Sequence, residues 1–370
     1  MKFKTGLSLN SRLGVMGSGQ LGRMFTQSAS AMGFRVKVYS PDSDTPSKFA
    51  GAEEFTGNYE DAETVWKFLS ETDALTFEFE NIPEKCLSAI DDYCRNVRAI
   101  PVCPSTDSIR ISQNRIKEKT YFNSIGLKTA PFIPVNSESS REVLGKFNYP
   151  AILKTNTFGY DGKGQTKFSS SEDLFRFLSE HSQTEFILEE KISFDAEISV
   201  IGSRTENGEI FCYKASENLH ENHILSKTVH PANMDESLLK KAEELTAVLL
   251  NSLKYVGVLG LEFFVRGNEL LCNEFAPRPH NSGHFSMDSG FCSQFDLQLF
   301  SLVFESLPFR PKDSSPCIMY NIIGEEFYRS PDSWIRDRAQ GDEWRLHLYQ
   351  KNLPRPGRKM GHLNVLRKHS

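Results

Sequence analysis

The sequence predicts a mixed α/β and α+β protein, in which a doubly wound parallel-sheet domain precedes a strand-rich domain and a small C-terminal domain. Strand and helix patterns alternate over the first hundred residues, the order that produces a parallel sheet covered on both faces. The middle of the chain then changes to closely spaced strands. Three prolines between residues 308 and 316 mark a linker. The predicted domains are 1–105, 106–307 and 308–370.

The N-terminal elements follow from periodicity and end signals. Helical apolar spacing over Gln20–Met32 stops at Gly33, a residue suited to the left-handed conformation at a helix end. Asp61 has a side chain that caps helices, here one running to Glu71. Apolar or alternating runs predict the strands Leu13–Met16, Arg35–Tyr39 and Ala74–Phe79.

The later elements are predicted in the same way. Ser105 is expected to begin one long polar helix that includes Gln113, Arg115, Lys117 and Lys119. The other expected elements are the strands Ala151–Lys154, Glu185–Glu190, Glu197–Gly202, Ile210–Lys214, Gly257–Val265 and Glu269–Phe275 and the helices Ser171–His181, Glu236–Lys254 and Gln294–Glu305.

Composition and charge indicate a soluble cytoplasmic protein. The formal net charge of −5 gives no reason to expect a nucleic-acid partner. Seven cysteines without a Cys-x-x-Cys pair fit a reducing compartment. The N-terminus lacks the apolar core of a signal peptide. The most apolar stretch, Val256–Val265, is too short to span a membrane.

A glycine-rich turn follows the first predicted strand. Gly17-Ser-Gly-Gln-Leu-Gly22 matches the pattern that brings a phosphate to a helix N-terminus. A dinucleotide site also needs an acid after the second strand, and only Asp42 is offered there, behind a proline. Three interpretations remain open: a dinucleotide site, a strand-to-helix turn that binds nothing, and a site for another small polar molecule.

Two glutamates near the end of a predicted strand are also candidates. Glu78 and Glu80 are expected on one side of the strand segment Thr76–Asn81, and open α/β sheets place ligands at the carboxyl ends of their strands. The alternative is a half-buried strand with solvated carboxylates.

A second glycine-rich segment has the features of a phosphate-covering loop. No Walker-type P-loop pattern occurs, but Lys154 ends a strand and Gly159–Gln165 follows with three glycines and Lys163. Lys154 suits a point-charge contact to a phosphate. The alternative is a glycine-rich hairpin. Downstream, the strand ending in Glu189–Ile192 could offer backbone groups to an adenine edge, and Glu197 either holds ribose hydroxyls or faces water.

Two acids in apolar strands predict a metal site. Glu262 and Glu274 flank the turn Arg266-Gly-Asn268, so a hairpin is expected to pair their strands. Unpaired carboxylates are costly to bury, and Mg²⁺ would account for both; the alternative is a wet sheet face. The next segment, Ala276–His284, is rich in polar groups and bounded by prolines, as in a rigid site loop, although a surface loop has similar composition.

Together these motifs resemble the 5-(carboxyamino)imidazole ribonucleotide synthase family of ATP-grasp ligases. The resemblance covers nearly the whole chain. Its most specific parts are GYDGKGQ and PRPHNSGH. The other matching segments are MGSGQLGRM, TFEFENIP, LEEKISFDAEISV, YVGVLGLEFFV and RPGRKMGHLN.

The resemblance implies an ATP-grasp fold and an ADP-forming reaction of ATP, bicarbonate and 5-aminoimidazole ribonucleotide, with Mg²⁺ and without biotin, in a homodimer. The implied nucleotide contacts are Arg115, Lys154, Gly159, Tyr160, Asp161, Gly162, Lys163, Gly164, Gln165, Glu189, Glu190, Lys191, Ile192, Glu197, His220, Asn273 and Glu274. The implied ribonucleotide contacts are Gln20, Glu78 or Glu80, Tyr160, Asp161, Lys163, Arg278, His280, Asn281, Ser282, Arg358 and Lys359, and the metal ligands are Glu262 and Glu274.

The chain departs from the family pattern at two places. The metal strand lacks the asparagine of Glu-x-Asn, since Ala276 follows Phe275, and the chain continues only briefly past Asn364, so a shortened C-terminal domain is expected. Three other functions stay open on the sequence: formate-dependent glycinamide ribonucleotide formylation, nucleotide sensing without catalysis, and nicotinamide-dependent oxidoreduction.

Overall fold

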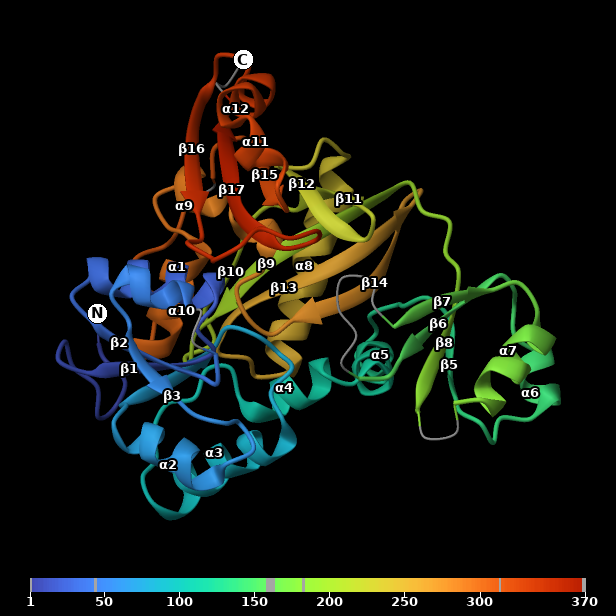
Figure 1. The fold of residues 1–370 in the computed structure, drawn as a ribbon, viewed down its shortest axis with the longest axis horizontal. Helices are drawn as coiled ribbons and strands as arrows, with labels where there is room; N and C mark the ends of the chain where they lie inside the picture. The colour runs from blue at the N-terminus through green and yellow to red at the C-terminus, as the bar shows by residue number, and fades with distance from the viewer. Residues whose placement is uncertain (1, 43–44, 158–163, 182–183, 313, 368–370) are drawn as a thin grey trace.

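A computed structural model describes residues 2–42, 45–157, 164–181, 184–312 and 314–367. Three sheets organise these residues: two four-stranded sheets and one of nine strands. Figure 1 shows the small green sheet standing apart on one side, with the N-terminal sheet and the large sheet close together on the other.

The N-terminal sheet confirms the predicted doubly wound order. Its strands are parallel, in the order β3-β2-β1-β4. Gly33 adopts φ +88°, and the Asp61 carboxylate accepts from the N–H groups of Glu63 and Thr64, as the end signals predict. The elements are β1 (Arg12–Met16), α1 (Gln20–Ala31), β2 (Arg35–Ser40), β3 (Glu53–Thr56), α2 (Ala62–Ser70), β4 (Ala74–Phe77) and α3 (Glu84–Asn96), with a 3₁₀ turn at Pro46–Ala50.

The small sheet is antiparallel and forms a separate lobe. Its strand order is β5-β8-β6-β7, and helices α6 and α7 pack with it around their own apolar cluster. The elements are β5 (Phe132–Val135), α6 (Arg141–Gly145), β6 (Ala151–Thr155), β7 (Gln165–Phe168), α7 (Ser171–Ser179) and β8 (Phe186–Glu190).

The large sheet runs from the middle of the chain to its last strand. The order is β14-β13-β9-β11-β12-β15-β17-β16, with β10 paired to β9. The strands after residue 316 therefore extend the same sheet (Figure 1). Its strands are β9 (Ala196–Arg204), β10 (Ile210–Cys212), β11 (Ser216–Glu221), β12 (Ile224–His230), β13 (Gly257–Arg266), β14 (Glu269–Ala276), β15 (Cys317–Ile323), β16 (Glu343–Leu348) and β17 (Lys359–Leu366). The helices are α8 (Glu236–Ser252), α9 (Ser286–Ser289), α10 (Gln294–Val303), α11 (Glu326–Arg329) and α12 (Pro331–Ala339), with a 3₁₀ turn at Asn281–Gly283.

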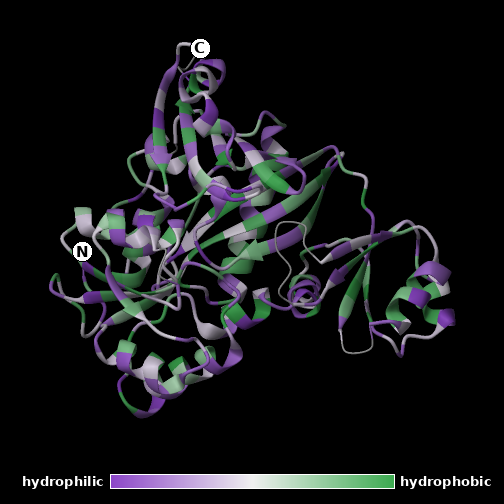
Figure 2. Ribbon diagram, viewed as in Figure 1, coloured by the Kyte–Doolittle hydropathy of each residue, from purple (hydrophilic) through white to green (hydrophobic). Residues whose placement is uncertain are grey.

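Helix α10 joins the N-terminal sheet to the large sheet. The amide of Gln298 donates to Thr76 Oγ1 at 2.7 Å and accepts from Val258 N–H at 2.6 Å, which ties β4 to β13. One continuous apolar cluster includes Phe25 of α1 and Phe295 of α10. Figure 2 shows hydrophobic and hydrophilic segments alternating along several elements, as expected when each has one buried face.

Two predicted elements are wrong in their extent. The single helix expected from Ser105 is two helices, α4 (Thr106–Ser112) and α5 (Arg115–Ser124). Asn114 interrupts it because its side chain accepts from Lys117 N–H and caps α5. The strand expected over Ala74–Phe79 ends at Phe77, so Glu78 and Glu80 do not share a strand face.

A buried histidine in β12 predicts acid sensitivity. His230 stacks on Phe285 with ring centroids 3.7 Å apart, and burial lowers the pKa of its imidazole to about 3. The unfolded chain takes up this proton near pH 6.5 and the folded chain does not, so stability falls as pH falls from there toward 3, by up to about 1.4 kcal/mol per pH unit. His230→Phe removes this proton uptake, so the free energy of unfolding is expected to fall less steeply with decreasing pH. Urea unfolding at several pH values measures the slope. An equal slope in His230→Phe and in the unaltered protein would contradict the assignment.

Candidate active site

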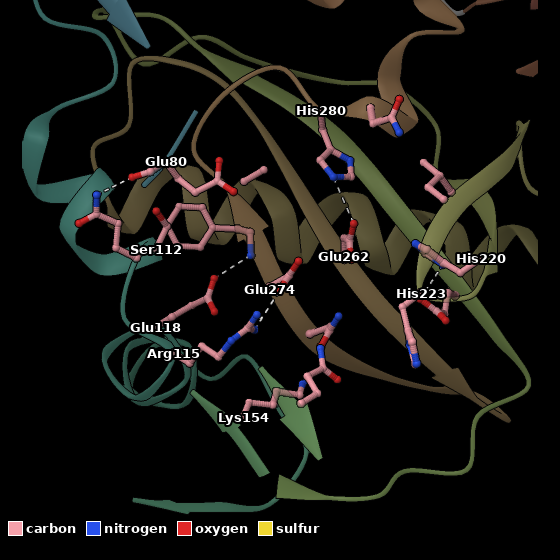
Figure 3. Close-up of a pocket in the computed structure, with 18 of the residues that line it drawn as sticks. Glu80, Ser112, Arg115, Glu118, Lys154, His220, His223, Glu262, Glu274 and His280 are labelled. Atoms are coloured by element: carbon pink, nitrogen blue, oxygen red, sulfur yellow. Dashed lines mark hydrogen bonds and ion pairs between the residues drawn. The ribbon is translucent and has the colours of Figure 1, made fainter. Parts of the chain in front are cut away.

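A cavity of about 650 Å³ lies where the three sheets face one another. Figure 3 shows side chains pointing into it from the segment after β4 (Glu80), from helix α5 (Arg115) and from the strands β6, β13 and β14 (Lys154, Glu262 and Glu274). The predicted site residues that line it are Gln20, Glu78, Glu80, Arg115, Lys154, Gln165, Glu189, Glu190, Lys191, Ile192, Glu197, His220, Glu262, Asn273, Glu274, Arg278, His280, Asn281 and Lys359.

A buried carboxylate holds two lysines at one end of the cavity. Glu189 Oε2 lies 2.8 Å from Lys154 Nζ, and its Oε1 lies 3.5 Å from Lys119 Nζ. Burial acts to raise the pKa of Glu189, but the two ammonium groups lower it to about 2. Burial lowers the pKa of Lys154, an effect that the Glu189 charge opposes. The network thus holds Lys154 at the cavity with its ammonium group against a carboxylate.

The two predicted metal carboxylates lie on paired strands, as expected. The β13–β14 hairpin forms, and its register shifts between Leu261 and Phe263, beside Glu262. Arg115 Nη1 lies 3.0 Å from Glu274 Oε2. Burial acts to raise the pKa of Glu274, but Arg115 and Lys154 lower it. Burial and the neighbouring Glu274 raise the pKa of Glu262 to about 8, so a cation between the two would relieve their repulsion.

The donor set fits a hard divalent cation that also binds phosphate. Among the described residues, no three carboxylate, imidazole or thiol groups gather closely enough to hold a metal alone. Glu262 and Glu274 supply carboxylate oxygens, and the neighbouring Asn273 Oδ1 is buried with no hydrogen-bond partner among the residues that the structure describes. Mg²⁺ prefers oxygen ligands and usually shares them with substrate phosphates.

Helix α5 fixes the backbone on both sides of Glu274. Strand β14 is an edge strand of the large sheet. Phe275 N–H donates to Glu118 Oε1 at 2.8 Å, and Lys119 Nζ donates to Asn273 O at 3.1 Å. Burial, and then the charge of Glu274, raise the pKa of Glu118 to about 8. Glu118 and Lys119 therefore bond backbone groups of β14 on both sides of Glu274 and hold this residue in place, while Cys272 N–H on the same strand donates to Lys128 O.

The glycine-rich turn holds a carboxylate of the chain itself. Glu78 accepts from Gly19 N–H at 2.5 Å and from Gly22 N–H at 2.7 Å. A Cβ atom added at Gly17 would stand 2.2 Å from Glu78 Cγ, and one at Gly19 would stand 2.8 Å from Glu78 Oε1. The glycines thus make room for Glu78, and the dinucleotide interpretation of this motif is wrong because its anion position is filled.

The loop after β14 carries basic groups into the cavity. Arg278 Nε donates to Glu80 Oε2 at 2.6 Å, which orients the guanidinium. His280 Nε2 lies 3.2 Å from Glu262 Oε1 (Figure 3), and burial, then Arg278, lower the pKa of His280 to about 3. Farther along the cavity His220 Nδ1 lies 3.2 Å from Glu197 Oε2; burial acts to lower the pKa of His220, and Glu197 raises it.

Comparison with known proteins identifies the family. Three family models match: the ribonucleotide synthetase preATP-grasp domain over residues 10–113, the ATP-grasp domain over 120–295 and the phosphoribosylaminoimidazole carboxylase C-terminal domain over 317–370. A Staphylococcus aureus (strain MRSA252) protein named N5-carboxyaminoimidazole ribonucleotide synthase is 34% identical over 97% of this chain and 94% of its own. The chain belongs to the N5-carboxyaminoimidazole ribonucleotide synthase family.

Solved structures of this synthase family share the fold. The Staphylococcus aureus synthetase complexed with ADP superposes with a TM-score of 0.86 at 32% identity, covering 98% of this chain and 96% of that one. The Aspergillus clavatus synthase in complex with ADP and 5-aminoimidazole ribonucleotide gives 0.84 at 28% identity, covering 97% and 94%. The ATP-grasp fold with its preceding parallel-sheet domain is therefore confirmed.

Some site residues expected from the synthase resemblance lie elsewhere. Ser282 and Gly164 are near the cavity but do not line it. Arg358 also lies outside the lining, with its guanidinium donating to Leu353 O at 2.9 Å. Gly159, Tyr160, Asp161, Gly162 and Lys163 fall outside the described residues.

The structure also brings to the site residues that the sequence reasoning did not select. Glu118 and His284 line the cavity, and Lys119 touches Glu189 behind it. From the sequence alone, Lys119 is placed only in a polar helix and His284 only at the end of a loop. The available signal for Glu118 and Lys119 is the high density of charged residues in helix α5, whose Arg115, Glu118 and Lys119 are buried; the sequence holds no comparable signal for His284.

Proposed function

We propose that this chain carboxylates 5-aminoimidazole ribonucleotide with bicarbonate and ATP, giving 5-(carboxyamino)imidazole ribonucleotide, ADP and phosphate in purine biosynthesis. The observation that carries the proposal is a single cavity in which buried cations, a carboxylate pair and a basic loop face one another. A relative whose structure covers nearly the whole chain was crystallised with ADP and the aminoimidazole ribonucleotide.

We assign the two ends of the cavity to the two nucleotides. Lys154, Arg115 and Glu189 belong to the small-sheet end, where the resemblance expects ATP. Arg278, Asn281 and Lys359 belong to the opposite end, between the N-terminal sheet and β17, where it expects the ribonucleotide. Asn281 Nδ2 is buried without a hydrogen-bond partner among the described residues, as suits a group awaiting a polar ligand.

The chemistry we propose has two steps. Bicarbonate oxygen attacks the γ-phosphorus of ATP, the bond to the ADP oxygen breaks, and carboxyphosphate forms. The aminoimidazole nitrogen then takes the carboxyl group, loses a proton and releases phosphate. Lys154 and Arg115 supply fixed positive charge where negative charge develops, which is the main protein contribution to phosphoryl transfer.

Magnesium, bound by Glu262 and Glu274 and by ATP oxygens, would neutralise phosphate charge during the transfer. Arg115 and Lys154 keep Glu274 ionised and so ready to bind a cation. Water would hydrolyse carboxyphosphate, so the reaction requires that water is excluded from the cavity.

We further propose that the protein is a cytoplasmic homodimer acting on small molecules, without nucleic-acid or membrane partners. The family resemblance supports the dimer, and the formal net charge of −5 supports the absence of a nucleic-acid partner. Within the described part of the chain no helix has the length and apolar character needed to cross a membrane. Analytical ultracentrifugation tests the dimer.

The proposed function is tested by ADP release with all three substrates and with each omitted in turn. We expect release to require ATP, bicarbonate and the aminoimidazole ribonucleotide together, and formate not to replace bicarbonate. Binding of ATP without any turnover would instead show a nucleotide sensor. Turnover of glycinamide ribonucleotide with formate would show the other purine ligase.

Arg278→Ala is expected to raise the KM for the aminoimidazole ribonucleotide while ATP affinity stays nearly unchanged. A charge-assisted hydrogen bond contributes about 1.5–3 kcal/mol, or about 10- to 150-fold in KM. Arg266→Ala, an exposed arginine at the end of β13, is the control and should change neither value. If the variant loses ATP affinity alone, Arg278 is wrongly assigned to the ribonucleotide end and belongs to the ATP end of the cavity.

A further inference from the structure

Ser282 is linked to the cavity through His280. Its side chain is fully buried and does not line the cavity. Its Oγ lies 2.8 Å from His280 Nδ1 on one side and 2.7 Å from Ser199 Oγ on the other. A direct contact between Ser282 and the ribonucleotide, which the family resemblance implied, is therefore not supported by this geometry.

The hydrogen bonds continue away from the cavity through two more strands. Asn218 Nδ2 donates to Ser199 Oγ at 2.9 Å, and Thr228 Oγ1 donates to Asn218 Oδ1 at 3.0 Å. The four side chains, from β9, β11, β12 and the 3₁₀ turn, are at most 6% exposed. We call Thr228, Asn218, Ser199 and Ser282 the buried relay.

The relay has a direction that is set at the imidazole ring. The backbone N–H of Ser282 points to His280 Nδ1 at 3.4 Å, and an N–H group can only donate, so Nδ1 is an acceptor. Ser282 Oγ lies 2.8 Å from the same nitrogen and therefore donates to it. A hydroxyl has only one proton to donate, so the proton between Ser282 Oγ and Ser199 Oγ comes from Ser199, which accepts from the Asn218 amide.

An acceptor at Nδ1 places the ring proton of His280 on Nε2. That nitrogen lies 3.2 Å from Glu262 Oε1 and faces the cavity. The ring therefore presents an N–H donor to the cavity close to Glu262, and to any oxyanion bound there. The opposite tautomer would present a lone pair to a bound oxyanion, which is repulsive.

We propose that Ser282, Ser199 and Asn218 are positioning residues that hold His280 as the Nε2–H tautomer, so that it donates a hydrogen bond to a substrate oxyanion. The identity of the oxyanion as a bicarbonate or phosphate oxygen rests on the proposed function. The assignment of the tautomer does not rest on it, because the assignment follows from the buried contacts alone.

The first test reads the tautomer directly. In protein labelled with ¹⁵N-histidine, two-bond nitrogen–proton correlations distinguish the protonated from the unprotonated ring nitrogen, and His280→Gln identifies the signals. We expect Nε2–H in the unaltered protein. In Asn218→Asp the carboxylate accepts from both Thr228 and Ser199, which reverses the relay and moves the ring proton to Nδ1. A Nδ1–H or doubly protonated ring in the unaltered protein, or an unchanged ring in folded Asn218→Asp, overturns the proposal.

A buried aspartate can prevent folding, so the second test uses milder changes in a double-mutant cycle. Ser199→Ala is expected to slow ribonucleotide-dependent ADP release about tenfold, the size of one oriented hydrogen bond. In a His280→Ala background the same change should have little effect, since Ser199 acts through the ring. Ser203→Ala is the matched control, because Ser203 lies on the same strand and is equally buried at 1% exposure.

Equal losses from Ser199→Ala in both backgrounds would overturn the relay. If the protein releases no ADP with the aminoimidazole ribonucleotide, the proposed function fails and the nitrogen spectra still decide the tautomer. The two failures are thus distinguishable.

Discussion

Glu274→Gln is expected to lower ADP release with all three substrates by roughly 100-fold or more, the scale seen when a preorganised electrostatic contact is lost in phosphoryl or acyl transfer. The amide keeps the shape of the side chain but removes the charge that faces Arg115 at 3.0 Å. The remaining activity should need a higher Mg²⁺ concentration. Steady-state rates over a Mg²⁺ titration measure both effects.

The matched control for this change is Glu269→Gln on the same strand. Glu269 pairs with Lys128 and Arg266 at the far end of β14, so its replacement should leave the rate and the Mg²⁺ requirement unaltered. Full activity of Glu274→Gln at low Mg²⁺ would show that the metal pair is assigned wrongly.

Lys154→Ala is expected to weaken ATP binding by about 1.5–3 kcal/mol, or about 10- to 150-fold in Kd. The ammonium group is buried, so its contact with a phosphate is little screened by water. The protein should still fold, because Lys119 remains 3.5 Å from Glu189 and that carboxylate is not left without a cation.

Calorimetric titration with ATP measures the change. Lys167→Ala is the control, since Lys167 lies on the neighbouring strand β7, paired with Ile152, and is exposed. An unaltered Kd in Lys154→Ala would remove this lysine from the ATP site.

The sequence predicted those parts of the site whose residues lie close together in the chain. The β13–β14 hairpin brings Glu262 and Glu274 together within one local unit, and its turn is predictable from the local sequence. The position of Lys154 near a strand end is predictable for the same reason. The parallel N-terminal sheet followed from alternating elements.

Contacts between distant segments were not predictable in this way. Nothing local indicates that Glu78 binds the turn at Gly19, 59 residues earlier. Lys119 looked solvated in a polar helix, yet it is buried against Asn273, 154 residues away. The break at Asn114 was missed because capping by its side chain competes with a pattern that otherwise continues.

The last strands show the same limit. We expected a separate small domain after residue 308, but β15 pairs with β12, and β17 then carries Lys359 to the cavity. The domain boundaries remain a prediction, since a continuous sheet crosses the last of them.

The position of Glu78 also decides which molecules can compete for the N-terminus of α1. A carboxylate tethered to the end of β4 is present there at a high effective concentration, and it already accepts from two backbone N–H groups. A free pyrophosphate would have to displace the Glu78 carboxylate. It would also have to fit into the space beside the glycines that the Glu78 side chain now fills. Nicotinamide dinucleotides at ordinary concentrations are therefore excluded by competition as well as by shape, although the turn has the sequence pattern of their binding sites.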